Sequence, residues 1–439
     1  MSPSPRANPR GLLLFIILAA SFFPSTTAWA QSDVFINLAG RPGEARTLAL
    51  GLPPFIAENP ERSQDALLAR QLRDVVRNDL LFSRYFTIQE DGPLFDGANL
   101  KDIMLQWKAR LAGWLLTAKV GSGGKITLSV QLHDLNSGEA VFERYYRQEA
   151  AFQRSLAHKV ADDLVMALTG KNGIAHTFLA FANDKTGYKE IYLMDYDGAN
   201  FKALTSHGSI SILPRFSPDR KSLVYTSYKD GNPDLFMLDL NAGRRRAISV
   251  EQGLNMAGGF SPDGTQLLMT LSRQKSPNLY VKNLGDGSLT RLTQHFGADS
   301  SPTFSPDGQQ AAFVSDRSGN PQIYLLDITT QRVKRLTSLN WCDSPAWSPT
   351  GEWIAFAGRI HNKDKMDIFL VDITGNQIRQ LTRGEGSNEN PAWSPDGRFL
   401  AFTSTRNKRS ELFVMDADGS APHRLTEIPG DTFTPAWSN

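Results

Sequence analysis

The sequence predicts an α/β N-terminal domain followed by an all-β six-bladed β-propeller that the C-terminal strand closes. Three observations carry this prediction. A Ser-Pro-Asp-Gly turn recurs along the last two thirds of the chain, with successive serines 44, 44, 43 and 46 residues apart. An aromatic strand motif and a closing Leu-Thr or Ile-Ser motif each occur six times in the same register. The region before them alternates helical and strand-like patterns without the repeat, which is typical of a separate domain.

Residues 1–30 have the pattern of a Sec-type signal peptide. Arg6 and Arg10 precede a short apolar run over residues 12–23, and residues 28–30 read Ala-Trp-Ala, the small-x-small pattern that a signal peptidase cuts. We therefore expect cleavage between Ala30 and Gln31. The apolar run is shorter than the roughly 18 to 20 residues that span a bilayer, so the sequence predicts export and no direct membrane insertion.

Residues 31–170 are predicted to form the α/β domain. Two segments, 64–83 and 152–168, carry apolar residues at helical spacing. Five further segments are predicted strands, over residues 34–38, 47–52, 113–120, 125–135 and 140–148. Residues 171–173, Lys-Asn-Gly, follow a helix-ending Thr-Gly and are the expected hinge to the next domain.

Residues 171–439 are predicted to form the propeller. Each repeat unit reads as four short strands, and a period near 44 residues with four strands is the pattern of a propeller blade. The length of this region holds six such units. The turn motif stands at Ser217, Ser261, Ser305, Ser348 and Ser394, where Pro in the second place presets a type I turn.

The ends of the repeat array predict a closed ring. The first unit, from Ile174, lacks the strand that precedes the turn motif, and the missing copy stands at the C-terminus as residues 435–438, Pro-Ala-Trp-Ser. A last strand that completes the first blade leaves no unpaired edge between the first and last repeats.

Charge and cysteine content exclude several classes of function. The chain has 47 Lys and Arg against 45 Asp and Glu, and the signal peptide holds two of the arginines and no acid. The processed chain is therefore formally neutral, which argues against a nucleic-acid partner held by bulk charge. Cys342 is the only cysteine, so no internal disulfide can form, and we expect it to be buried.

No catalytic, cofactor or metal site is expected. The seven histidines are scattered without a His-Glu-x-x-His pair, and no Gly-x-Ser-x-Gly nucleophile motif occurs. Asp195 and Asp197 lie in an Asp-x-Asp-Gly stretch, which we interpret as a turn of the repeat because the spacing of a calcium loop is absent. The aromatic residue before each turn serine is interpreted as core packing between blades.

The candidate binding residues lie just before and within the innermost strand of each blade, at one mouth of the axial channel. Loops and strand ends on a rigid ring are where binding concentrates. Four acids interspersed with apolar side chains indicate a surface for a peptide with some positive charge and apolar anchors. These mouth residues are Asn255, Met256, Asp299, Ser300, Asp343, Ser344, Glu389, Asn390, Asp431, Thr432 and Phe433.

The order of signal peptide, α/β domain and six Ser-Pro-Asp-Gly blades closed by Pro-Ala-Trp-Ser resembles the TolB family of the Tol-Pal system, over the whole processed chain. The resemblance implies a monomeric, non-enzymatic adaptor in the periplasm of a Gram-negative bacterium. It implies that the propeller binds the outer-membrane lipoprotein Pal and that the N-terminal segment binds TolA, which connects to TolQ and TolR. The expected roles are outer-membrane invagination during cell division and outer-membrane integrity.

Carried over by position, Pal binding falls on the mouth residues. TolA binding falls on the segment that begins after the signal peptide, with Gln31, Ser32, Asp33, Val34, Phe35 and Ile36. We expect Pal binding to shift this segment between docking on its own domain and pairing with TolA.

One alternative stays open at this point. Some propeller enzymes use paired carboxylates, so a periplasmic propeller hydrolase or lyase could use the channel acids. The acids stand on different blades with no matching His or Arg near them in the sequence, which favours the adaptor.

Overall fold

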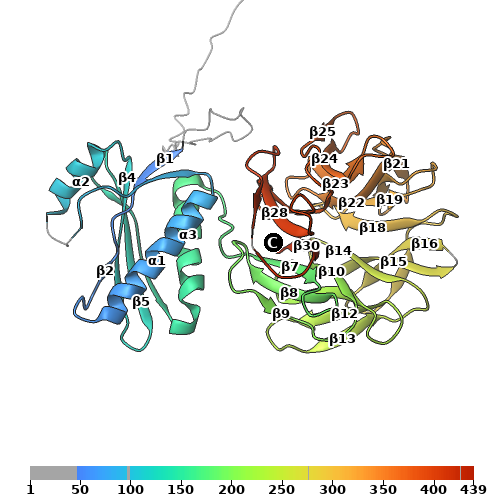
Figure 1. Cartoon of the computed structure of the whole chain (residues 1–439), viewed down its shortest axis with the longest axis horizontal. Coiled ribbons are helices and arrows are strands. Elements are labelled where there is room, and N and C mark those ends of the chain that lie inside the picture. The colour runs from blue at the N-terminus through green and yellow to red at the C-terminus, as the bar shows by residue number, and fades with distance from the viewer. Residues whose placement is uncertain (1–46, 96–98, 275, 426) are drawn as a thin grey trace, which may run out of the picture. The chain divides into compact units, whose positions relative to one another are not determined.

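The computed structural model describes residues 47–95, 99–274, 276–425 and 427–439 (Figure 1). The predicted signal peptide, its cleavage site and the TolA-binding segment lie outside these residues. Within the described residues, no helix is long and apolar enough to cross a membrane.

The N-terminal region forms a mixed sheet of six strands in the order β3-β1-β4-β5-β6, with β2 pairing β4. The strands β1 and β2 pair parallel with β4, β1 also pairs parallel with β3, and β4, β5 and β6 are antiparallel. The bounds are β1 (Leu48–Gly51), β2 (Ile56–Ala57), β3 (Phe86–Gln89), β4 (Trp114–Gly121), β5 (Ile126–Asp134) and β6 (Ala140–Gln148).

The helices of this region are α1 (Ser63–Phe82), α2 (Leu100–Lys108), the short 3₁₀ helix η1 (Ala150–Phe152) and α3 (Gln153–Thr169). Helices α1 and α3 pack against each other, and each buries most of the apolar stripe from which it was predicted, although Leu67 of α1 is exposed. Leu72 and Val76 in α1 and Val160 in α3 are completely buried. The sequence reasoning missed β2 and β3, which are short, and it also missed α2, although Leu100, Ile103, Met104 and Trp107 stand at helical spacing.

Six four-stranded antiparallel sheets follow, and they confirm the predicted six-bladed propeller. Blade 1 comprises β30 (Thr432–Trp437), β7 (Phe178–Asn183), β8 (Glu190–Asp195) and β9 (Lys202–Ala203). Blade 2 comprises β10 (Ser211–Phe216), β11 (Ser222–Ser227), β12 (Asp234–Asp239) and β13 (Arg245–Ser249). Blade 3 comprises β14 (Asn255–Phe260), β15 (Gln266–Gln274), β16 (Ser276–Asn283) and β17 (Leu289–Arg291).

The remaining three blades follow the same plan. Blade 4 comprises β18 (Asp299–Phe304), β19 (Gln310–Ser315), β20 (Gln322–Asp327) and β21 (Val333–Arg335). Blade 5 comprises β22 (Trp341–Trp347), β23 (Trp353–Arg359), β24 (Asp367–Asp372) and β25 (Ile378–Gln380). Blade 6 comprises β26 (Asn388–Trp393), β27 (Phe399–Ser404), β28 (Glu411–Asp416) and β29 (His423–Arg424).

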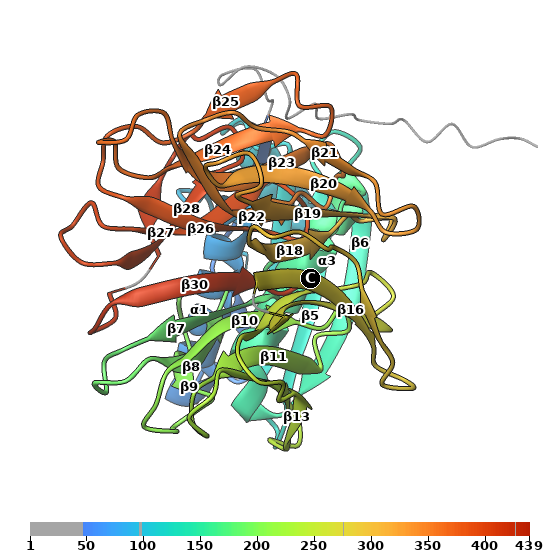
Figure 2. The ribbon, with the colours of Figure 1, turned by 90° about the vertical axis from the view of Figure 1, so that its right-hand side faces the viewer.

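The ring closes as the sequence predicted. The last strand, β30, pairs antiparallel with β7, the first strand of the propeller (Figure 2). Trp437 is opposite Leu179, and the Trp437 indole N–H donates a hydrogen bond of 2.9 Å to Thr177 Oγ1. Residues 46–439 cluster as one compact unit, so the expected domain boundary between residues 170 and 171 stays a prediction.

The repeated turn is stabilised by its own side chains. The Ser261 hydroxyl donates to Asp263 Oδ1 at 2.5 Å and accepts the backbone N–H of Gln266 at 2.9 Å. The N–H of Gly264, at φ 73°, closes the turn onto the Ser261 carbonyl. The same serine contacts recur at Ser217, Ser305 and Ser394. The motif recurs because each position supplies one of these bonds.

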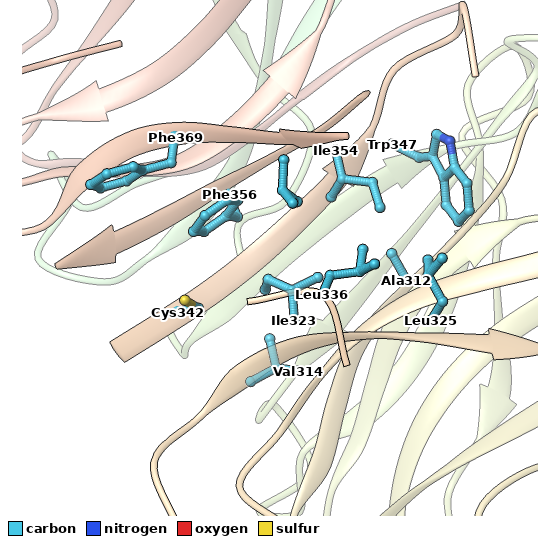
Figure 3. Packing of buried hydrophobic residues seen from close by; sticks show 11 residues of the cluster. Ala312, Val314, Ile323, Leu325, Leu336, Cys342, Trp347, Ile354, Phe356 and Phe369 are labelled. Carbon is cyan, nitrogen blue, oxygen red and sulfur yellow. The ribbon is translucent and has the colours of Figure 1, made fainter. Parts of the chain in front are cut away.

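Apolar side chains of neighbouring blades fill the space between the sheets. Figure 3 shows one such cluster, in which Ile323 and Leu325 of blade 4 meet Ile354 and Phe356 of blade 5. Trp347, the aromatic residue before a turn serine, belongs to it, which confirms the predicted packing role of that position. Cys342 is buried in the same cluster, as expected, and burial raises the pKa of its thiol to about 11.

Candidate functional site

The inner strand of every blade, the one nearest the axis, has the same irregular shape. We count positions along these six strands so that the turn serine, or its equivalent Ser438, is position 7. The ladder to the second strand shifts register in all six blades, between positions 2 and 5 in five of them and between positions 3 and 6 in blade 3. Position 3 has positive φ in five of them, at Leu213, Ser301, Ser344, Asn390 and Thr434. Such bulges re-aim side chains, here at the rim where the strands begin.

Position 1 lies beneath this rim and not on it. Asn255 and Asp299 are 0% exposed and Thr432 is 3% exposed. The Asp299 carboxylate accepts two hydrogen bonds from Arg317 Nη2, at 2.8 and 2.9 Å. The Asn255 amide binds Ser249 and backbone atoms of its own loop, and Thr432 Oγ1 accepts from Asn183. These three predicted mouth residues hold the rim together and offer no exposed polar atom to a partner.

The other predicted mouth residues are accessible. Glu389 is exposed, and seven more are half-buried: Met256, Ser300, Asp343, Ser344, Asn390, Asp431 and Phe433. The structure brings blades 5 and 6 together here, because Ser344 Oγ donates to Asn390 Oδ1 at 3.2 Å. The accessible part of the mouth therefore consists of positions 2 and 3 together with Asp431.

Charge at the mouth is less acidic than the sequence indicated. Asp299 is neutralised by Arg317, and Asp431 accepts the backbone N–H of Ser410 and lies 4.0 Å from Arg409. Burial raises the pKa of Asp343, and the nearby Glu389 carboxylate adds to the rise. Two neighbouring carboxylates, Asp343 and Glu389, are thus the acids that can attract a cationic partner group.

Six basic side chains surround the mouth, and the sequence reasoning missed them. Each stands in the last two residues of the second strand of its blade or within two residues after it, at Lys185, Lys229, Arg273, Arg317, Arg359 and Arg406. Five of the six stack on aromatic rings; Lys185 Nζ, for example, lies 4.3 Å from the centroid of Phe201 and Arg406 Cζ 4.4 Å from that of Phe413. Their recurrence at one repeat position was the available signal. A partner that covers the rim should therefore present acidic groups to these six basic side chains, and cationic or apolar groups to the mouth residues that they surround.

A second polar cluster lies where α1 and α3 contact the turn after β8. His158 Nδ1 is 2.8 Å from Asp79 Oδ2, and His158 Nε2 is 3.7 Å from Asp195 Oδ2. The Tyr196 hydroxyl donates to Asp79 Oδ1 at 2.7 Å. Burial alone would lower the pKa of His158, but the hydrogen bonds and charges of these carboxylates outweigh it and raise the pKa to about 9.

The same cluster explains the Asp-x-Asp-Gly stretch. Arg154 Nε donates to Asp195 Oδ2 at 3.1 Å, and Arg154 Nη2 pairs with Asp197. Ligand atoms of Asp79, His158 and Asp197 lie within 4.8 Å of one another and could reach a metal ion. The Arg154 guanidinium and the protonated His158 already supply the positive charge that these carboxylates need, which fits the structural interpretation of the turn.

These features define a class of protein, a closed six-bladed β-propeller that follows an α/β region and carries a rim of mixed charge. The family of the TolB beta propeller domain matches residues 165–439, and the chain belongs to this family. A solved structure of TolB from Acinetobacter baumannii is similar over 90% of this chain and 97% of that chain, with 27% identity and a TM-score of 0.77.

Curated relatives match over a shorter stretch. A Tol-Pal system protein TolB of Geobacter sulfurreducens is 35% identical over 216 residues, which is 48% of each protein. A TolB homolog of Chlorobium chlorochromatii is 36% identical over 167 residues, which is 37% of this chain and 38% of that protein. The chain thus spans less than half the length of these relatives in the alignments.

Proposed function

We propose that this chain is the periplasmic TolB component of a Tol-Pal system and acts as a non-enzymatic adaptor. Its propeller mouth binds the lipoprotein Pal, and the segment from Gln31 to Ile36 binds TolA, which links it indirectly to TolQ and TolR. The work of such an adaptor is outer-membrane invagination during cell division and outer-membrane integrity. It acts as a monomer, without cofactor, nucleic acid or membrane insertion.

The observation that carries the proposal is the likeness to the solved TolB, which extends over the α/β region as well as the propeller. The accessible mouth supports it, because Met256 and Phe433 offer apolar contacts beside the acidic pair of Asp343 and Glu389. Aromatic and Met side chains with a polar rim are typical of protein interfaces.

The enzymatic alternative gains no support from the channel acids. Asp299 is fully buried and bound by Arg317, and Asp431 is engaged with the backbone of Ser410. Asp343 and Glu389 are the acids left, and position 2 of the other four blades offers them Ile212, Met256, Ser300 and Phe433. These side chains supply no base, acid or cation for turnover.

Capture of Pal tests the mouth. Purified full-length chain with Glu389→Lys should bind immobilised Pal at least about tenfold more weakly than the unsubstituted chain, because the added cation opposes a cationic partner group. Glu352→Lys is the matched control: Glu352 is exposed in the turn after β22, at the other end of blade 5, and its change should leave Pal capture intact. Equal capture by both variants would remove Glu389 from the Pal site.

Capture of TolA tests the second half of the proposal. A chain that begins at residue 44 should lose TolA binding and keep Pal binding, because the two partners are assigned to different segments. Loss of both would contradict this assignment, and retention of TolA would place its site elsewhere.

A further inference from the structure

The axis of the propeller contains a cavity of about 430 Å³, which shares Ser344 and Asn390 with the predicted mouth residues. Residues from position 3 to the proline of the Ser-Pro-Asp-Gly turns line it, and all six inner strands contribute. The cavity is within the size range of small-molecule and peptide sites in proteins. The other residues that line it have no part in the proposed function.

One blade differs from the other five at the wall of this cavity. Position 5 carries Gly259, Thr303, Ala346, Ala392 and Ala436 in blades 3, 4, 5, 6 and 1. Blade 2 carries Arg215 instead, and Arg215 lines the cavity. Small residues at the five equivalent positions leave room in the channel for one long side chain and for something bound to it.

Arg215 lacks a negative partner among the described residues. Its Nη1 donates to the Pro214 carbonyl at 2.8 Å, and no carboxylate pairs with it. Burial lowers the pKa of its guanidinium to about 10, with no nearby charge acting against that effect. A guanidinium has five N–H donors, and a cation held away from bulk water is costly unless it is paired and hydrogen-bonded.

The rest of the lining defines what could pair with it. Among the described side chains around the cavity, Arg215 is the only charged one; the C-terminal residue Asn439 also lines it, and no nearby charge shifts the pKa of Arg215. Phe260, Phe304 and Trp347 and the prolines of positions 4 and 8 form the apolar part of the wall, and serine, threonine and asparagine side chains form a polar part. One fixed positive charge beside apolar wall segments complements one negative charge on a body that is at least partly apolar.

We propose that this axial cavity binds a monoanionic carboxylate that carries an apolar body, with the carboxylate held by Arg215. A planar guanidinium matches a carboxylate through two parallel N–H···O bonds. A phosphate group would bring a second negative charge for which the described lining has no further cation. Arg215 is not among the proposed Pal and TolA contacts, although Ser344 and Asn390 belong both to the predicted mouth and to the cavity wall.

Isothermal titration calorimetry on the full-length chain tests the proposal, with hexanoate as the probe and hexanamide as its neutral counterpart. Hexanoate should bind, and hexanamide should bind about tenfold to a hundredfold more weakly, the loss expected for hydrogen bonds to a charged group. Arg215→Met should bring hexanoate down to the affinity of hexanamide, and Arg215→Lys should fall between. Arg244→Ala, at an exposed arginine in the turn between β12 and β13, should change neither affinity.

Two further probes separate the sources of such a carboxylate. Acetyl-Leu-Leu with a free C-terminus should bind more tightly than hexanoate if the natural ligand is a peptide terminus, and more weakly if it is a small free acid. Its C-terminal amide should lose the binding in either case.

Three results would overturn the site: no heat with hexanoate, equal affinity in Arg215→Met, or inorganic phosphate that binds more tightly than hexanoate. Melting temperatures of the variants show that each is folded. We expect Arg215→Met to melt no lower than the unsubstituted chain, because it removes an unpaired, half-buried charge.

Discussion

At the scale of single residues, position 1 of the inner strands carries different residue types, which make different contacts in the six blades. Position 1 is buried in all six blades, and its side chain contacts the neighbouring strand or loop. In blade 4 it is Asp299, which is held by both oxygens against Arg317. The same Arg317 also stacks on Phe313 and Tyr324. A residue that seemed to offer charge to a partner therefore serves the stability of its own blade.

Removal of Arg317 should be costly for this reason. Arg317→Ala leaves the completely buried Asp299 carboxylate unpaired, so the free energy of unfolding should fall by about 3 to 5 kcal/mol. The control is Arg273→Ala, at the equivalent place in blade 3, whose ion pair with Glu251 is solvent-exposed and should contribute at most about 1 kcal/mol. Urea unfolding of both variants measures the difference, and equal losses would contradict the structural role of Arg317.

At the scale of elements, closure of the ring depends on β30. This strand supplies the inner edge of blade 1, and without it the edge of β7 would be left unpaired. An unpaired inner edge invites pairing with another chain. Deletion of residues 432–439 should therefore give aggregated protein in size-exclusion chromatography, and a deletion variant with an unchanged melting temperature would refute the closure.

A single side chain of β30 gives a gentler test. Trp437 is 7% exposed and its indole is hydrogen-bonded, so Trp437→Ala should lower the free energy of unfolding by about 3 to 5 kcal/mol. Trp341, at the start of β22, is 36% exposed, and Trp341→Ala should cost much less. Chemical denaturation of both variants decides whether β30 is integral to the fold.

At the scale of the whole molecule, the polar cluster of His158 joins segments that are distant in the sequence. Asp79 lies in α1, His158 in α3 and Asp195 at the end of β8. The pKa of His158 is raised to about 9, above the ordinary value of about 6.5. The stability that this imidazolium contributes is fully present below pH 6.5 and is lost as the pH rises to 9 and beyond.

We therefore expect the free energy of unfolding to fall between pH 7 and pH 9.5, and His158→Gln should flatten this part of the profile. Two other groups near the cluster do not titrate there: the pKa of Asp162 is raised by burial, to about 6, and burial lowers the pKa of His176. Burial also raises the pKa of Asp79, the direct partner of His158. His361→Gln, at an exposed histidine, should keep the slope of the unsubstituted chain. Urea unfolding at four pH values gives the comparison, and an unchanged slope in His158→Gln would refute the role of His158.

How far the candidate site could be predicted depends on the range of the interactions involved. The repeat predicted that the mouth residues stand at or next to the starts of the inner strands, where the structure has them, but their exposure was assigned by sequence position alone and their binding role stays a prediction. Asn255 and Asp299 are buried with partners such as Ser249, 6 residues away at the end of β13, and Arg317, 18 residues away in the turn after β19. Arg215 differs from the small residues at position 5 of the other five blades, and this difference is visible in the sequence. The proposal that Arg215 binds a carboxylate depends on the cavity that it lines, which only the structure shows.

The propeller, its six blades and its closure could be predicted from local patterns repeated in register: a turn that bonds to itself, short apolar strands, and a C-terminal strand that supplies the one missing from the first blade. Which polar residues are exposed depends on tertiary contacts. A bulge of one residue re-aims the side chains of each inner strand. Asp299 is neutralised by Arg317, which is distant from it in the sequence, whereas Arg215 has only the Pro214 carbonyl as a partner. Charge and burial at the axis are therefore properties of the closed ring and not of any single repeat.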